Sequence, residues 1–174
     1  MKNIIAIILF LAGTLYVSAQ TSIFNKFEDL NEVTSVVVTQ EMFKLMKNMG
    51  GKTPEAKEYQ DLISGLSELK VLVTENSKIA ADMQTSFNSY ISSSKLTELM
   101  RIKDKGSTVS FYIKKSSKED IVYELVMFAN DGNSAKKQTI IMSLTGNIDL
   151  NKVYRLTEQM NIPGGEHLKN TKKQ

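Results

Sequence analysis

Apolar side chains recur at helical spacing along the first half of the chain and again near its end. This periodicity predicts helices over residues 22–30, 39–49, 53–64 and 77–91, and a last helix from residue 149 to about 162. The helix over 77–91 has the clearest pattern, with Ile79, Met83 and Phe87 on one face. Thr53 followed by Pro54 is the clearest start signal, because Thr caps a helix and Pro fits its first position.

A second pattern, rich in β-branched residues or alternating between apolar and polar, predicts strands. Residues 33–39 (VTSVVVT) and 69–74 (LKVLVT) are expected to form two strands. Four more strand-like segments follow with tight connections: residues 96–103, 108–115, 120–129 and 136–144. Residues 104–106 (DKG) and 130–133 (NDGN) are typical of hairpin turns, because Asn, Asp and Gly tolerate a positive φ.

These elements predict a two-layer α+β fold, since the helices lie early and late in the chain around a C-terminal meander of strands. We expect an antiparallel sheet of five or six strands, with helices mainly on one face and the other face partly open. No linker-like segment and no repeat divides residues 20–174, which predicts a single domain with a polar tail from about residue 163.

The N-terminal segment has the pattern of a secretory signal peptide. Lys2 is followed by an apolar run over residues 4–11, and Val17 and Ala19 are small residues at the positions that signal peptidase reads. We therefore expect residues 1–19 to be removed, leaving Gln20 as the first residue of a periplasmic or secreted protein. The competing interpretation, a retained membrane anchor, needs a longer apolar run and a stronger charged flank behind it.

Composition narrows the function classes. The chain has no cysteine, so we expect neither disulfide bonds nor a lipid anchor, and the expected removal of residues 1–19 would leave no transmembrane anchor. Removing residues 1–19 takes away one lysine, so the net charge falls from +3 to +2. That balance argues against a nucleic-acid-binding domain, which usually carries clustered Lys and Arg.

Three stretches of the chain resemble a known family. FNKFEDLNEVTSVVVTQEMFKLM, ELMRIKDKGSTVSFYIKK and SLTGNIDLNKVYRL are similar, in this order, to the domain of unknown function 4252 family. The resemblance covers essentially all of residues 20–174. It implies an exported envelope protein of a Gram-negative bacterium with a single α+β domain. It assigns no activity and no functional residue. Many family members are lipoproteins, and this chain differs from them because it lacks the cysteine that carries the lipid.

The motifs that could carry chemistry are incomplete. Residues 50–53 (GGKT) lack the first glycine and the preceding strand of a phosphate-binding loop, and residues 130–134 (NDGNS) lack the later ligands of a calcium loop. Residues 92–95 (SSSK) have the Ser-x-x-Lys spacing without its companion motifs. His167 is the only histidine and lies in the polar tail, so we predict no metal, cofactor or catalytic site. A site built from carboxylates or serines stays open.

A partner surface is the more specific hypothesis. Tyr112, Val122, Val126 and Phe128 are placed by strand alternation on one side of the meander, and we predict that they form an exposed apolar surface. The alternative is that the strand over 120–129 is central and covered on both faces. The leading functional prediction is a non-enzymatic envelope module that binds another protein. The alternatives are a small-molecule or lipid carrier with its site between sheet and helices, and third an enzyme that uses carboxylates and serines.

Overall fold

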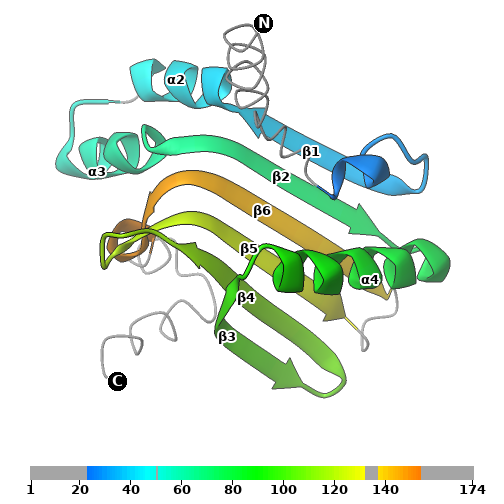
Figure 1. Ribbon diagram of the computed structural model, residues 1–174. Coiled ribbons are helices and arrows are strands. Elements are labelled where there is room, and N and C mark those ends of the chain that lie inside the picture. The colour runs from blue at the N-terminus through cyan, green and yellow to red at the C-terminus, as the bar shows by residue number, and fades with distance from the viewer. Residues whose placement is uncertain (1–22, 50, 132–136, 154–174) are drawn as a thin grey trace, which may run out of the picture.

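The computed structural model describes residues 23–49, 51–131 and 137–153, and within these ranges six strands form one antiparallel sheet (Figure 1). The strands are β1 (Val33–Thr39), β2 (Leu66–Thr74), β3 (Thr97–Asp104), β4 (Ser107–Lys115), β5 (Ile121–Asp131) and β6 (Gln138–Asp149). Their order across the sheet is β1-β2-β6-β5-β4-β3, so β1 and β3 are its edge strands. This confirms the predicted α+β fold with its C-terminal meander.

Side-chain caps mark the start of two of the described helices, and one of these caps, Thr53, is the residue that the sequence indicates. They are α2 (Gln40–Met49), α3 (Pro54–Ile63) and α4 (Ser77–Ser93), and a 3-10 turn, η2 (Asn25–Phe27), precedes them. The Thr53 hydroxyl accepts the backbone N–H of Ala56 at 3.2 Å, and the Asn76 carboxamide accepts the N–H of Lys78 at 2.9 Å. In Figure 1, α4 lies across one face of the sheet, whereas α2 and α3 lie at one end of it.

Each face of the sheet contributes to its own core cluster. On the face under α4, called the α4 face below, strand residues pack against α4 and the segment around η2; this cluster comprises Phe24, Phe27, Leu72, Met83, Phe87, Leu96, Val126, Phe128 and Ile141. The second cluster lies at the α2 and α3 end and comprises Phe43, Ile63, Leu66, Ile113, Val122, Leu125 and Ile148. Among the described helices, those that pack on the opposite face, α2 and α3, lie near one end of it, which fits the predicted partly open face.

Two predicted elements differ from those observed. The helix expected over residues 22–30 is wrong: only the three residues of η2 are helical, because Phe24 and Phe27 are both buried beside α4 rather than aligned along a surface helix. Strand β6 continues past its expected end at residue 144 to Asp149. It passes Gly146, whose φ of 136° favours glycine and where a Cβ would overlap the backbone of Gly65.

Several sequence predictions fall outside the described residues. These are the signal peptide over 1–19, part of the turn over 130–133, and the polar tail. The last helix is described only at its start, where Asp149 Oδ1 accepts the backbone N–H of Asn151 at 3.0 Å. The described part of this helix ends at Val153.

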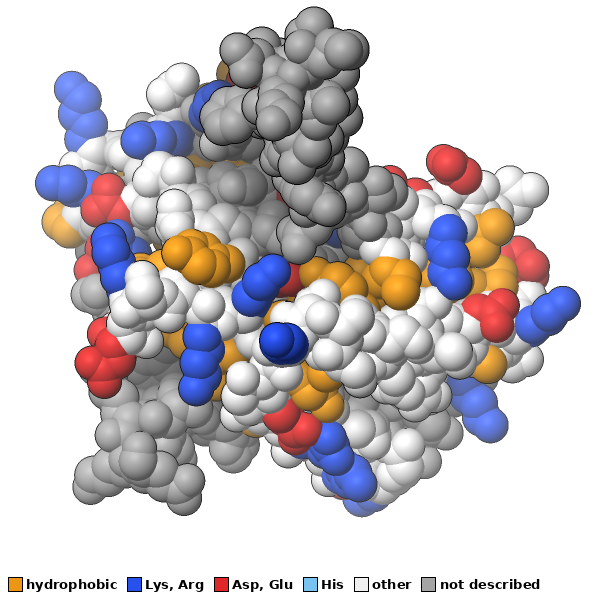
Figure 2. Space-filling view, viewed as in Figure 1, with side chains coloured by type: hydrophobic (Ala, Val, Ile, Leu, Met, Phe, Trp, Pro, Cys, Tyr) orange, Lys and Arg blue, Asp and Glu red, His pale blue; other side chains and the backbone are white. Residues whose placement is uncertain are grey.

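The outer surface on the α4 side is mixed in character. In Figure 2, seen from the same direction as Figure 1, Lys and Arg side chains and Asp and Glu side chains alternate over the described part of this surface, and apolar side chains show in separate areas between them. This side resembles an ordinary solvated surface.

Candidate functional site

The face opposite α4 carries two neighbouring rows of apolar side chains that cross all six strands. One row is Thr34, Val73, Ile140, Ala129, Val109 and Ile102, and the next is Val36, Val71, Met142, Met127, Phe111 and Met100. We call these twelve residues the apolar band. Thr34 is its only polar member, and the band contains no charged residue.

The apolar band is accessible although it is apolar. Thr34 and Val36 are exposed, and the other ten side chains are half-buried. The alternation is clear along β6, where Ile141 and Ser143 on the α4 face are buried, whereas Ile140 and Met142 in the band are not. Phe111 reaches the second core cluster, and the other band residues belong to neither cluster.

The four residues that the sequence analysis assigned to a partner surface lie elsewhere. Val126 and Phe128 are buried in the cluster under α4, and Val122 is buried in the second cluster. Tyr112 is half-buried, its ring meets Phe87 edge-on at 5.6 Å, and its hydroxyl donates to Glu98 at 3.1 Å. The predicted exposure of this surface is therefore wrong, because α4 covers the face on which most of it lies.

A β-bulge explains why strand alternation grouped Val122 with the wrong residues. The pairing of β4 with β5 shifts between Lys114 and Lys115: Lys114 pairs with Glu124 and Lys115 with Val122, so β5 has one residue more than β4 at this point. Val122 consequently packs with Ile148 in the second cluster, and Val126 packs in the first. A regular period of two cannot reveal such a shift.

The α4 face, by contrast, buries a polar cluster. The carboxylate of Glu124 is 6 % exposed; Tyr90 donates its hydroxyl to the two carboxylate oxygens at 2.8 and 2.7 Å, and Ser143 donates to one of them at 3.2 Å. Burial, followed by the hydrogen bond and the negative charge of Glu124, raises the pKa of Tyr90 well above its ordinary value of 10.0. Both hydroxyls are engaged with the carboxylate, so this cluster holds α4 to the sheet.

The raised pKa of Tyr90 predicts a loss of stability at alkaline pH. Below pH 10 the phenol keeps its proton in both states; above it, the unfolded chain loses the proton first, so rising pH favours unfolding. In Tyr90→Phe this dependence should vanish, and at neutral pH the variant should be about 1.5 kcal/mol less stable. Urea unfolding at pH 8.5 and pH 11 checks this, with Tyr123→Phe as the exposed control. An equal gap between wild type and Tyr90→Phe at both pH values would refute it.

A buried lysine lies on the same face. Lys70 of β2 is 4 % exposed, and its ammonium group lies 2.5 Å from Asn25 Oδ1 and 2.5 Å from Glu28 Oε1. Glu68 is a more distant partner at 3.7 Å. The lysine is thus saturated by groups that tie η2 to β2, which indicates a structural role.

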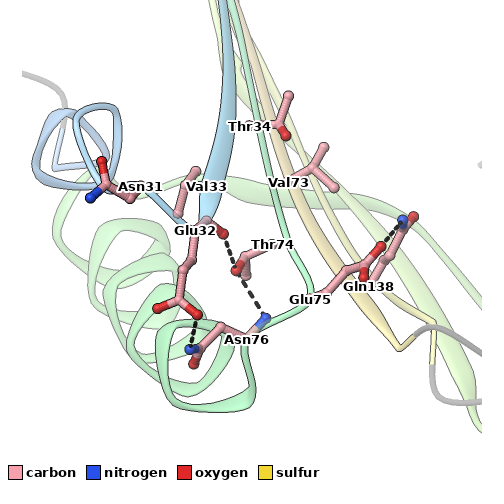
Figure 3. A pocket seen from close by; sticks show the side chains of 9 residues that line it. All are labelled: Asn31, Glu32, Val33, Thr34, Val73, Thr74, Glu75, Asn76 and Gln138. Atoms are coloured by element: carbon pink, nitrogen blue, oxygen red, sulfur yellow. Dashed lines mark hydrogen bonds between the residues drawn. The ribbon is translucent and has the colours of Figure 1, made fainter.

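A hollow of about 480 Å³ opens where β1 begins and β2 ends (Figure 3). Polar groups in its lining bind one another: Asn76 donates to Glu32 at 2.9 Å, and Gln138 donates to Glu75 at 3.0 Å. Thr74 donates to the backbone oxygen of Glu32 at 2.8 Å. A lipid or other apolar ligand needs mostly apolar walls, so the polar lining of this hollow does not suit one.

In the described part of the chain, the residues of the incomplete motifs form no functional site. Ser92 donates its hydroxyl to the backbone oxygen of Asn88 within α4, and Thr53 caps α3. Within the described ranges, no group of three or more His, Cys, Asp or Glu side chains could hold a metal ion. None of the helices described there is long and apolar enough to cross a membrane.

Comparison with known proteins identifies a family for this chain. A family model described as Domain of unknown function (DUF4252) matches residues 27–156. No curated protein and no solved structure matches the chain. The matched range contains all six strands, and therefore the whole apolar band.

Proposed function

The chain belongs to the DUF4252 family of unknown function, and we propose that it is a non-enzymatic protein-binding module whose docking site is the apolar band. One observation carries this proposal. The sheet buries polar residues on its α4 face, among them Lys70, Glu124 and Ser143, whereas its more apolar face is half-exposed. Apolar surface that the described core does not use is typical of a site for a partner.

The dimensions of the band fit one α-helix. Six strands at a spacing of about 4.8 Å place the two edge strands ~24 Å apart, and two rows of side chains are about as wide as a helix of ~10 Å diameter. A helix of roughly 16 residues would span that distance. On the other face, α4 shows that this sheet accepts a packed helix.

The partner chemistry follows from the lining. Because the band has no charged residue, a bound helix must present an apolar stripe and keep its charged residues away from the sheet. Affinity would then depend on the buried apolar area. We therefore propose an amphipathic helix of another protein as the occupant of the band.

We also infer that the protein acts in the envelope, outside the cytoplasm. Lys2, the apolar residues 4–11 and the small residues Val17 and Ala19 support this proposal. The intact mass of the protein purified from its host tests it, because export predicts a chain that begins at Gln20. A mass that includes residues 1–19 would contradict it.

Methionine oxidation should distinguish the two sheet faces. Met100, Met127 and Met142 of the band are half-buried, whereas Met83 of α4 is 0 % exposed. In dilute hydrogen peroxide we expect the three band methionines to form sulfoxide at least tenfold faster than Met83. Peptide mass spectrometry measures these rates. Protection of the band methionines equal to that of Met83 would mean that the band is covered.

A photo-crosslinking amino acid tests the occupant directly. Placed at Phe111 in the band, it should crosslink to an apolar helical segment of a partner when expressed in the native host. The same amino acid at Tyr123, an exposed aromatic residue outside the band, is the control and should give no such product. Crosslinks from position 111 to residues 154–174 of the same chain would show that the chain covers its own band, and would overturn the proposal.

A further inference from the structure

The two edge strands of the sheet differ in how well they are protected from pairing with another chain. Strand β3 (TELMRIKD) carries Glu98, Arg101, Lys103 and Asp104 and has a bulge, which are features that discourage edge-to-edge pairing. Strand β1 (VTSVVVT) has no charge, no proline and an uninterrupted register with β2. No described residue pairs with its outer side. Both Val36 (49 % exposed) and Val37 are exposed.

We propose that β1 pairs antiparallel with β1 of a second copy of this chain, so that the two sheets join into one. This inference rests on the edge strand and is independent of a partner at the apolar band. A strand without charge can pair with itself without placing like charges together. In a register centred on Val36, this residue faces Val36 of the second copy, and Ser35 faces Val37 of the second copy.

Exposed apolar residues beside β1 add area to this interface. Pairing of two seven-residue strands alone buries less than the ~1,200 Å² of a stable interface. Leu30, before β1, and Met42, at the start of α2, are both exposed. In the register centred on Val36, the end of one β1 adjoins the start of the other, so the start of α2, with Met42, comes near the segment of the second copy that carries Leu30.

Charge placed at Val36 tests the pairing. The purified full chain should have twice its monomer mass by light scattering coupled to gel filtration at about 50 µM. Val36→Lys and Val36→Glu should each weaken the dimer at least tenfold, because like charges then meet on the two-fold axis. An equal mixture of the two variants should restore a dimer, because Lys then faces Glu. Thermal unfolding of each variant shows that it is folded.

The matched control is Met100→Lys, which lies in the same row of the sheet on the opposite edge strand. It changes the apolar band as Val36→Lys does, but it leaves the β1 edge intact, so the dimer should persist. A monomeric wild type, or a dimer that Val36→Lys leaves unchanged, would overturn the proposal. A dimer weakened equally by Met100→Lys would assign the contact to the band instead.

Discussion

Replacing Phe87 with alanine should lower the free energy of unfolding by about 3–5 kcal/mol, the range found for large aromatic residues in a core. Phe87 is 3 % exposed, and its ring lies 4.9 Å from that of Phe128 and 5.6 Å from that of Tyr112. Alanine would leave a cavity between α4 and the centre of the sheet that its neighbours cannot fill. Urea unfolding followed by circular dichroism measures the loss.

Two methionines, one buried in the core and one in the apolar band, show how much of the loss depends on burial rather than on truncating an apolar side chain. Met83 is fully buried under α4, and Met127 lies in the apolar band. Met83→Ala should therefore cost about 2–5 kcal/mol, and Met127→Ala less than about 1 kcal/mol. If Met127→Ala cost as much as Met83→Ala, the band would be part of a core, and a free docking face would be excluded.

The positions of the helices and strands were largely predictable, because capping and turn residues nearby in the sequence determine where they begin and end. Thr53 and Pro54 start α3 as expected, and the predicted turn between β3 and β4 has a positive φ at Gly106, as its sequence indicates, and also at Lys105. The failure at residues 22–30 has a tertiary cause. Phe24 and Phe27 are placed by their burial beside α4, which local periodicity cannot show.

The candidate docking face was harder to predict, because in β2 the more apolar of the two alternating sets of side chains is the less buried one. Along β2, Leu69, Val71 and Val73 alternate with Lys70, Leu72 and Thr74, and a pattern rule buries the more apolar set. The structure buries Lys70, Leu72 and Thr74 instead. Leu72 packs in the apolar cluster under α4, whereas Lys70 and Thr74 are held by polar groups that are distant in sequence.

This reversal links the core to the candidate site. Glu124, Ser143 and Lys70 lie on the buried face because Tyr90, Glu28 and Asn25 satisfy them there. The α4 face buries these polar groups beside its apolar cluster, and the alternating apolar side chains of the same strands lie on the opposite face. The band is thus a consequence of how the chain satisfies its buried polar groups, and a partner helix would complete the second layer.

Lys70→Ala should be among the most destabilising single substitutions on the α4 face, at about 3 kcal/mol. Removing the ammonium group leaves Glu28, which is mostly buried, without its ion-pair partner, and leaves Asn25 without its donor. The 3-10 turn η2 would then lose its attachment to β2, and Phe27 beside it would pack less well. Urea unfolding measures the change, and hydrogen exchange should show increased opening around η2.

A double-mutant cycle decides whether the unpaired carboxylate causes the loss. Glu28→Gln removes the negative charge, so the double variant Lys70→Met, Glu28→Gln should be at least 1 kcal/mol more stable than the two single effects predict. Methionine keeps the apolar stem of the lysine and fills the same space between η2 and β2. Additive effects would mean that the packing of the lysine stem, rather than the ion pair, holds η2 to the sheet. In that case the burial of Lys70 would no longer explain why the polar side of β2 faces the core.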